Sequence, residues 1–415
     1  MLEQIKQQAK KARNVANILA NMSTLQKNEL LGAMADKLEL EIEYILQANA
    51  RDLIQAAEKG VSVAMQDRLR LTSDRIRDMA TGIRQVMKLP DPIGEVISGK
   101  TLPNGLQINK VRVPLGVLGI IYESRPNVTI DAIALCLKSG NLPVLRGGSE
   151  AINSNTALVE IMQNCLITKG LPKELITFIA YTDRQAVNYL LKLNEYIDVI
   201  IPRGGAGLIK TVIENSTIPV IETGVGVCHV FVDSSADLVM AENIVINAKV
   251  SRPAVCNSME TLLVHKNIAK NFLPVIVAKL QQQNVKVQVC EQGLIEVPGT
   301  KLADDACFAT ENLDLIISIK IVENLAEAIE HIERFGTKHS EAIVTNDYQN
   351  AQEFQKRVDA AVVYVNASTR FTDGFEFGLG AEIGISTQKL HARGPMGLSE
   401  LTSIKYIVNG NGQIR

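Results

Sequence analysis

The sequence contains no apolar run of the roughly 18 residues that a membrane-spanning helix needs. Its first twenty residues are charged and periodic, and they lack the apolar core and small-residue cleavage site of a signal peptide. A large excess of one charge is also missing, because 43 Lys and Arg stand against 45 Asp and Glu. We therefore expect a cytoplasmic protein with no nucleic acid and no membrane as partner.

Metal-binding and disulfide motifs are equally scarce. The six cysteines are scattered without a CxxC pair, and the five histidines show no HxxxH or HExxH spacing. Such cysteines stay free thiols in a reducing compartment, and we predict no metal site. What remains is a chain of 415 residues, 46% of them hydrophobic, which is enough for two or three domains.

The hydrophobic pattern predicts an α/β fold. Residues 1–90 read as helices, including one over 73–88 that Ser73 can cap. From about residue 115, short apolar strands alternate with helices, which is typical of doubly wound parallel sheets. The first series of strands is expected at 117–122, 142–145, 176–179, 198–201 and 219–222. A second series follows Gly226, at 229–232, 260–264, 313–321, 342–345 and 361–365.

Three further helices are expected in the second series, near 268–282, 324–335 and 348–357. In the first series, Thr129 can cap a helix that Gly140 ends.

Two segments fit neither series of strands and helices. Residues 99–113 contain a Pro-Asn-Gly turn followed by alternating apolar and polar residues, and the tail 402–415 is also strand-like. Terminal strands of this kind often pair with a neighbouring subunit, and the alternative is a hairpin within one subunit.

Cys256 lies in the segment SRPAVCNSMETLLVH, between a proline and a predicted strand. A thiol at a loop-to-strand junction can face a cleft, and Arg252 could favour its thiolate form. The residues alone do not exclude an inert buried thiol, which is what most intracellular cysteines are.

The segment YESRPNVT, residues 122–129, lies at the carboxyl end of a predicted strand, where doubly wound sheets bind ligands. The Asn127 amide is the kind of donor that holds an oxyanion, although Asn before a helix is also a common turn residue. We assign Glu123 and Ser124 of this segment to a cofactor site.

Paired glycines occur in two strand-to-helix loops, RGGSEA and PRGGAG. Such loops expose backbone N–H groups and suit phosphate, but many strand-to-helix turns need glycine for backbone reasons only. Neither loop is the G-x-G-x-x-G fingerprint of a standard dinucleotide fold. The residues assigned here to a phosphorylated cofactor are Arg146, Gly147, Gly148, Ser149, Glu150, Arg203, Gly204 and Gly205.

Together these segments resemble the γ-glutamyl phosphate reductases (glutamate-5-semialdehyde dehydrogenases) of the aldehyde dehydrogenase superfamily. The resemblance covers nearly the whole chain and includes VPLGVLGIIYESRPNVT, IIPRGGAGLI, SRPAVCNSMETLLVH, FGTKHSEAIVTND and KLHARGPMGL. It implies an aldehyde dehydrogenase-like fold and the reduction of L-glutamyl 5-phosphate by NADPH in proline biosynthesis. A thioester on Cys256 would be the intermediate.

The resemblance also implies roles for single residues. Cys256 falls at the nucleophile, Asn127 at the oxyanion amide and Glu311 at the residue that holds the nicotinamide ribose. Arg146 stands where many members have Lys, and an Arg fork fits the 2′-phosphate of NADPH. Glu222 falls at the superfamily's general base, which a reductase of an acyl phosphate does not need. It is either catalytic or a strand-end carboxylate that lines the cofactor site.

The substrate would carry a phosphate, an α-carboxylate and an α-ammonium group. Candidates to hold these groups are Arg125, Lys338, His339, Ser340 and Arg370. The alternatives are another acylating or oxidising aldehyde dehydrogenase that acts on a different small aldehyde, and a non-catalytic scaffold with the same fold.

The resemblance further implies a division of the chain. We expect a cofactor domain at 1–98 and 114–225, a catalytic domain at 226–375 and a return to the cofactor domain at 376–401. Residues 99–113 and 402–415 would be oligomerisation strands of a homodimer or homotetramer. A glutamate 5-kinase that hands over the labile substrate is a possible partner.

Overall fold

The computed structural model describes residues 1–123 and 125–415. The chain divides into two compact units. Unit 1 comprises Met1–Thr223, Gly378–Gly384 and Met396–Arg415, and unit 2 comprises Gly224–Phe377 and Ile385–Pro395. The first boundary lies within two residues of the expected one. The expected return at 376–401 is only partly right, because its middle segment, Ile385–Pro395, belongs to unit 2.

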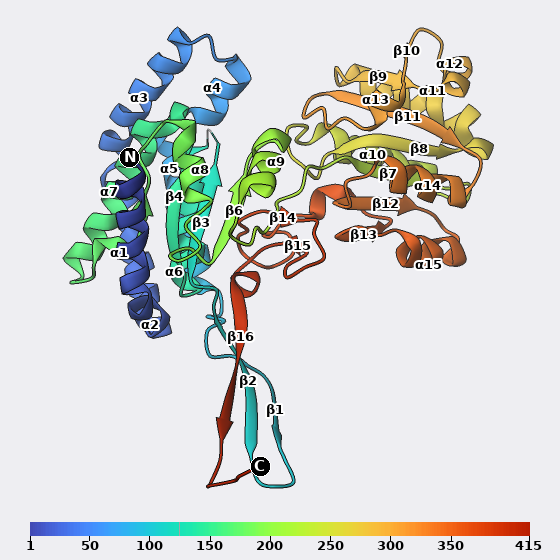
Figure 1. The fold of residues 1–415 in the computed structure, drawn as a ribbon. Coiled ribbons are helices and arrows are strands. Elements are labelled where there is room, and N and C mark those ends of the chain that lie inside the picture. Colours follow the sequence, from blue (N-terminus) through green and yellow to red (C-terminus); the bar gives the residue numbers. More distant parts are fainter. Residues whose placement is uncertain (124) are drawn as a thin grey trace. The chain divides into compact units, whose positions relative to one another are not determined.

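Unit 1 is built on a four-stranded parallel sheet in the order β5-β4-β3-β6 (Figure 1). Its strands are β3 (Val117–Tyr122), β4 (Leu142–Arg146), β5 (Thr177–Phe178) and β6 (Val199–Arg203). A regular strand at 219–222 was expected but is not found. Pro219 has no N–H to donate, and the segment makes a single bridge, between Val220 and Ile200.

The helices of the first 90 residues are present as predicted. They are α1 (Leu2–Ala20), α2 (Thr24–Leu40), α3 (Ile42–Glu58), α4 (Val63–Leu69) and α5 (Ser73–Lys88). The cap of α5 is not Ser73 but Thr72, whose side chain accepts from the Arg75 N–H. Of the helices in the described residues, none is long and apolar enough to cross a membrane.

The helix after β3 begins earlier than predicted. α6 (Pro126–Lys138) has Pro126 in its first turn, where a missing N–H costs nothing. Thr129 is therefore no cap. Its hydroxyl is buried and hydrogen-bonds to the Tyr122 hydroxyl at 2.6 Å and to Asn155 at 2.9 Å. Gly140 ends the segment as expected, with φ +74°.

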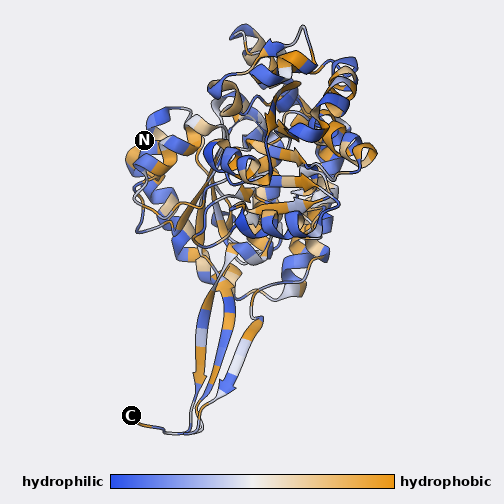
Figure 2. Ribbon diagram, turned by 90° about the vertical axis from the view of Figure 1, so that its right-hand side faces the viewer, coloured by the Kyte–Doolittle hydropathy of each residue, from blue (hydrophilic) through white to orange (hydrophobic). Residues whose placement is uncertain are grey.

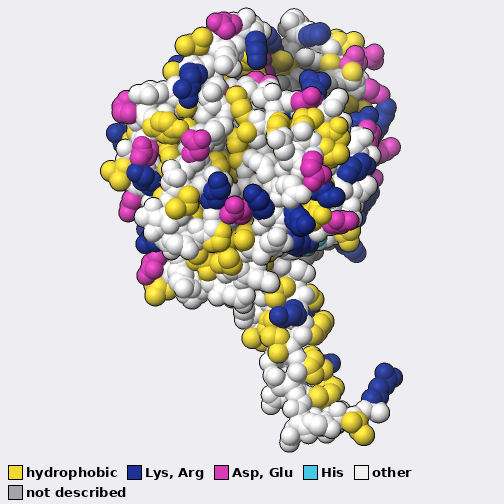
Figure 3. All heavy atoms as spheres, turned by 60° about the vertical axis from the view of Figure 1, so that its left-hand side comes forward, with side chains coloured by type: hydrophobic (Ala, Val, Ile, Leu, Met, Phe, Trp, Pro, Cys, Tyr) yellow, Lys and Arg dark blue, Asp and Glu magenta, His cyan; other side chains and the backbone are white. Residues whose placement is uncertain are grey.

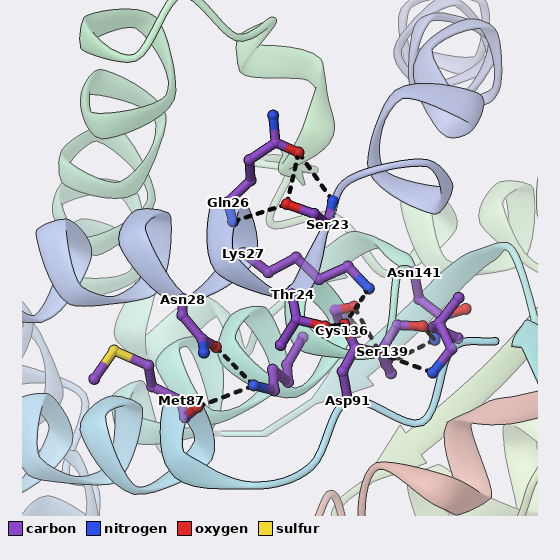
Figure 4. A network of polar contacts seen from close by, with 12 residues as sticks. Ser23, Thr24, Gln26, Lys27, Asn28, Met87, Asp91, Cys136, Ser139 and Asn141 are labelled. Atoms are coloured by element: carbon purple, nitrogen blue, oxygen red, sulfur yellow. Dashed lines mark hydrogen bonds and ion pairs between the residues drawn. The ribbon is translucent and has the colours of Figure 1, made fainter. Parts of the chain in front are cut away.

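Buried polar contacts tie α2 and α5 to α6 (Figure 4). The Lys138 ammonium, on a fully buried side chain, donates to Asn28 at 2.6 Å and to the Met87 carbonyl at 2.9 Å. Lys27, which is 1% exposed, pairs with Asp91 at 2.9 Å. Each buried ammonium thus has an oxygen partner, as its desolvation requires.

Three further α-helices belong to unit 1. They are α7 (Ile152–Thr168), α8 (Arg184–Leu190) and α9 (Ala206–Asn215).

Unit 2 contains a seven-stranded parallel sheet in the order β10-β9-β11-β8-β7-β12-β13. Its strands are β7 (Cys228–Val232), β8 (Met259–His265), β9 (Lys286–Val289), β10 (Lys301–Leu302), β11 (Ile316–Val322), β12 (Ser340–Val344) and β13 (Val362–Val365). Five of these were predicted, and the short β9 and β10 were missed. The predicted α/β class with two parallel sheets is confirmed.

The helices of unit 2 connect its parallel strands. They are α10 (Leu238–Val250), α11 (Lys266–Gln282), α12 (Glu291–Glu296), α13 (Asp305–Phe308), α14 (Leu325–Phe335) and α15 (Tyr348–Arg357). Three of them, α11, α14 and α15, were predicted within two residues at each end.

A separate antiparallel sheet belongs to unit 1 and extends from the rest of it as a long ribbon (Figure 1). β2 (Gln107–Pro114) lies between β1 (Val96–Thr101) and the C-terminal β16 (Thr402–Asn409). Apolar and polar residues alternate along these strands (Figure 2), and apolar side chains line the ribbon's surface (Figure 3). Those exposed by more than a third are Val96, Ile97, Ile404, Tyr406, Ile407 and Val408.

Candidate active site

Cys256 lies in a turn that leads directly into β8. The Ser258 N–H donates to the Val255 carbonyl at 3.0 Å, so Cys256 and Asn257 are the two central residues of the turn. The Cys256 side chain is partly exposed, whereas Cys136, Cys165 and Cys228 are buried. Burial raises the pKa of each of these three thiols, which makes them poor nucleophiles.

The backbone at Gly226 passes unusually close to this turn. A Cβ atom at Gly226 would lie 1.5 Å from the Cys256 carbonyl oxygen. The Gly226 N–H donates to the Glu311 carboxylate at 2.8 Å. Glu311, expected at the nicotinamide ribose, therefore also holds the segment that contacts the cysteine turn.

Two cationic side chains belong to the same region of unit 2. The Arg370 guanidinium hydrogen-bonds to the Asn257 side chain, and its Nε donates to Ser251 at 3.1 Å. It interacts electrostatically with Arg252 and with the Cys256 thiol. Burial, followed by the Arg252 charge, lowers the pKa of Arg370. A guanidinium near Cys256 favours the thiolate and suits an anionic substrate.

The other substrate candidates of unit 2 fall into two groups. Lys338 is exposed, with φ +63°, and its ammonium lies 3.5 Å from Asp359. His339 and Ser340 are fully buried, and His339 Nδ1 lies 2.8 Å from Ser340 Oγ. Burial fits these two residues to a supporting role better than to direct contact with substrate.

In unit 1, the residues predicted at the strand end follow β3. Asn127 is exposed in the first turn of α6, and its amide donates to the Asp131 carboxylate at 3.2 Å. Burial raises the pKa of Asp131 to about 6, which outweighs the opposing effect of that hydrogen bond. Arg125 is exposed, and Ser124 lies outside the described residues.

The glycine loop after β6 already holds a carboxylate. Glu123 Oε2 accepts from the Gly205 N–H at 2.9 Å, at the start of α9. A Cβ atom at Gly204 would lie 2.6 to 2.8 Å from that carboxyl group. The loop thus uses its glycines for a close approach to Glu123, so a phosphate at the same N–H would meet a like charge.

The loop after β4 fits an anionic ligand better. Arg146 is 9% exposed, its Nη2 donates to the Thr182 carbonyl at 3.2 Å, and its buried Nε has no hydrogen-bond partner among the described residues. A Cβ atom at Gly147 would lie 2.2 Å from the Asn155 amide nitrogen, so the loop passes closer to this side chain than any residue but glycine allows. An unsatisfied guanidinium N–H is costly when buried, and an added phosphate oxygen would satisfy it.

The remaining cofactor candidates lie close to these loops. Gly148, Ser149 and Glu150 form the start of the short helix after β4, where Ser149 Oγ lies 3.3 Å from Glu150 Oε1. Arg203 ends β6 and interacts electrostatically with Asp131. Glu222 is half-buried, three residues after Pro219.

Comparison with known proteins identifies the family. The model of the aldehyde dehydrogenase family matches residues 2–293. The chain belongs to the aldehyde dehydrogenase family. It is 60% identical over 412 residues to a γ-glutamyl phosphate reductase of Moorella thermoacetica, covering 99% of each chain. It is 58% identical over 414 residues to that of Carboxydothermus hydrogenoformans, covering 100% of each.

Solved structures agree with this family. The crystal structure of γ-glutamyl phosphate reductase from Thermotoga maritima matches with a TM-score of 0.97 and 51% identity, covering 99% of each chain. An acetylating aldehyde dehydrogenase from Geobacillus thermoglucosidasius matches with a TM-score of 0.72 and 19% identity, covering 100% of this chain and 98% of that one. The second match shows the aldehyde dehydrogenase fold alone.

Several residues that support the turn at Cys256 were not predicted from the sequence. Asn257 donates to the carbonyls of Arg370 and Thr372, and Thr369 donates to the Asn257 carbonyl at 2.7 Å. Gly226, just before β7, and Cys228, its first residue, also contact the turn. The only signal for Asn257 was its place beside Cys256, and nothing local marked the others.

Proposed function

We propose that this aldehyde dehydrogenase is a γ-glutamyl phosphate reductase. It would reduce L-glutamyl 5-phosphate to L-glutamate 5-semialdehyde and release phosphate, a step of proline biosynthesis. The observation that carries this proposal is 60% identity over 99% of the chain to a γ-glutamyl phosphate reductase, with Cys256 partly exposed in the turn before β8. A nicotinamide cofactor accords with the family.

In the proposed reaction, the Cys256 thiolate attacks the γ-acyl carbon and forms a C–S bond. The C–O bond to phosphate breaks, and phosphate leaves with the electron pair. Asn127 and the Cys256 N–H would stabilise the oxyanion, each by about 3 kcal/mol. The exposure of Asn127 supports this role, because its amide has a second N–H besides the one bonded to Asp131.

The resulting thioester would accept a hydride, which a bound nicotinamide cofactor would supply, and cleavage of the C–S bond would then free the thiolate and the aldehyde. None of these reaction steps requires Glu222, since no water has to be activated. We therefore propose that Glu222 lines the cofactor site.

We further propose that the cofactor is NADPH and that Arg146 binds its 2′-phosphate. The buried, unsatisfied Nε of Arg146 supports this assignment. Gly147, Gly148, Ser149 and Glu150 would lie beside the ribose, and Glu311 would bind the nicotinamide ribose. Glu123, Arg203, Gly204 and Gly205 remain predicted contacts of the cofactor, with Glu123 as the anion at the start of α9.

For the substrate, Arg370 and Arg252 are the proposed anion-binding pair of unit 2, because Arg370 interacts electrostatically with both Arg252 and Cys256. Lys338 and Arg125 are predicted to contact its other charged groups. The Lys338 ammonium lies 3.5 Å from the Asp359 carboxylate, and a substrate carboxylate can replace that partner.

A homodimer or homotetramer is the proposed assembly, through the ribbon of β1, β2 and β16. Its outer strands leave two sheet edges with exposed apolar residues. Deleting residues 403–415 should lower the number of subunits in the assembly, as measured by light scattering. An unchanged number of subunits would contradict this role. Association with a glutamate 5-kinase is a further prediction, which co-elution of the two proteins would test.

A steady-state assay tests the proposed function. With glutamate 5-semialdehyde and NADP, turnover should require phosphate and should fall at least about a thousandfold in Cys256→Ala. Phosphate-independent oxidation would indicate a different aldehyde dehydrogenase activity. Absence of turnover, together with no preferential iodoacetamide labelling of Cys256, would indicate a non-catalytic scaffold.

A further inference from the structure

The thiol of Cys228 contacts the turn that contains Cys256. Cys228 is the first residue of β7 and fully buried, and its Sγ is 3.2 Å from the Cys256 carbonyl oxygen. A carbonyl oxygen only accepts, so the thiol must donate. We propose that Cys228 is a positioning residue that holds the Cys256 carbonyl and thereby fixes the backbone that carries the nucleophile. This inference rests on the proposed role of Cys256.

Cys228 is suited to donate and not to react. Burial is the main cause that raises its pKa well above the ordinary value of a thiol, and the nearby Glu341 adds to this effect. The side chain is therefore a protonated S–H at neutral pH. It is also 0% exposed, so a substrate cannot reach it.

A chain of buried polar groups fixes the position of Cys228. His339 Nδ1 lies 3.7 Å from its sulfur and 2.8 Å from Ser340 Oγ. Ser340 Oγ lies 2.6 Å from the Thr372 hydroxyl, which lies 2.8 Å from the Tyr364 hydroxyl. These groups lie in β7, in β12 and the residue before it, in β13 and in the segment after β13, so several elements of unit 2 together fix the direction of the S–H.

The other side of the turn is held by the segment after β13. The Thr369 hydroxyl donates to the Asn257 carbonyl at 2.7 Å, and the Asn257 amide donates to the Thr372 carbonyl at 2.9 Å. Thr372 thus takes part in both sets of contacts. Hydrogen bonds from the segment after β13 hold the turn at Asn257, and the Cys228 thiol holds it at Cys256. Of these contacts, that of Cys228 is made directly with the reactive residue.

The chemistry is sensitive to this contact. A displacement of the Cys256 carbonyl would shift the Cα atom of Cys256 and turn the thiolate that it carries away from the acyl carbon. A displacement of about 1 Å at a reacting atom can cost about a hundredfold in rate. Loss of a weak S–H donor should cost less, and we expect kcat to fall about tenfold with KM changed less than twofold.

The test compares Cys228→Ala, which removes the donor, with Cys228→Ser, which keeps one. Cys165→Ala is the matched control, because Cys165 is also buried and its thiol contacts a backbone carbonyl, that of Ala33, in unit 1. The readouts are kcat and KM, and the pH profile of Cys256 alkylation by iodoacetamide, followed by peptide mass spectrometry. Circular dichroism and thermal melting check folding, and Ser340→Ala serves as a second variant that breaks the supporting chain.

The proposal expects a lower kcat and a shifted alkylation profile in Cys228→Ala. In Cys228→Ser, kcat should recover to within about threefold of the wild-type value, and Cys165→Ala should behave like the wild type. Equal loss in both Cys228 variants, or no change of the alkylation profile in Cys228→Ala, would overturn it. If Cys228→Ala does not fold, an unchanged alkylation profile in a folded Ser340→Ala would overturn it as well. A fully active Cys256→Ala would instead overturn the proposed function, so the two failures are distinguishable.

Discussion

The Cα atom of Gly226 approaches the carbonyl oxygen of Cys256 so closely that a Cβ atom would lie 1.5 Å from it. No side chain can occupy that space, and the obstacle is backbone, which cannot rotate away. The turn before β8 and the segment before β7 are therefore interlocked. This close approach predicts that even the methyl group of alanine at position 226 displaces Cys256.

We expect Gly226→Ala to lower kcat at least about a hundredfold, since reacting groups must be placed to within about an ångström. It should also destabilise the protein by about 2 kcal/mol or more, because a buried overlap forces a backbone shift. Gly82→Ala is the matched control, since no atom lies within 4 Å of a Cβ atom at Gly82 in α5. It should leave kcat unchanged and raise stability slightly. A fully active Gly226→Ala would contradict the interlock.

If Arg146 binds the 2′-phosphate, it should determine the preference for NADPH over NADH. Arg146→Lys keeps a positive charge but loses the guanidinium fork, and we expect KM for NADPH to rise about tenfold while KM for NADH stays within twofold. The measurement is the phosphate-dependent assay with each cofactor. Arg184→Lys is a suitable control, because Arg184 interacts electrostatically with Arg146 but lies at the start of α8. An equal change for both cofactors in Arg146→Lys would show that Arg146 does not read the 2′-phosphate.

Asp359 predicts a pH-dependent contribution to stability. Its carboxylate accepts from Lys389 at 2.8 Å and from Arg393 at 2.9 Å, and these hydrogen bonds lower its pKa from 3.8 to about 2. Because the pKa is lower in the folded state, the stabilisation is fully present above about pH 4. It is lost as the pH falls through about 2. Since Asp359 is 40% exposed, solvent screening limits the effect to at most about 1 kcal/mol.

Asp359→Asn should therefore reduce the free energy of unfolding near pH 6, and the difference from wild type should vanish between pH 4 and pH 2. Urea denaturation across this range measures it, with the exposed Asp78→Asn on α5 as control. A difference that persists unchanged at pH 2 would exclude the carboxylate charge as its cause.

The ion pair of Lys249 and Glu260 lies in the core of unit 2. The ammonium and the carboxylate are 3.1 Å apart on side chains that are 0% and 1% exposed. Desolvation lowers the pKa of Lys249 and raises that of Glu260, and each charge opposes the shift of the other. Asn312 donates a further hydrogen bond to Glu260 at 2.9 Å.

Lys249→Met should cost about 3 kcal/mol of unfolding free energy, because it leaves a carboxylate buried without its cation. Adding Glu260→Gln removes that charge, so the double variant should recover at least about 1 kcal/mol relative to Lys249→Met. Chemical denaturation of the wild type, both single variants and the double variant completes the cycle. A double variant no more stable than Lys249→Met would contradict this account.

Local pattern in the sequence was enough for the α/β class and for most elements. The continuously apolar strand 117–122 and the amphipathic helix 73–88 carry their own periodicity, and the structure gives both of them the predicted ends. The motif around Cys256 also pointed to a thiol at a loop-to-strand junction, where the structure places it. Such features depend on residues near one another in the chain.

Tertiary structure alone decided how the distant segments meet. Thr129 is a good cap by type, yet buried Tyr122 and Asn155 bind its hydroxyl, and the helix begins at Pro126. Strand order brings the start of β7 against a turn some 30 residues later, which makes Gly226 and Cys228 neighbours of Cys256. Contacts of this range depend on which strands pair, and pairing is settled by burial across the whole sheet, which no local pattern records.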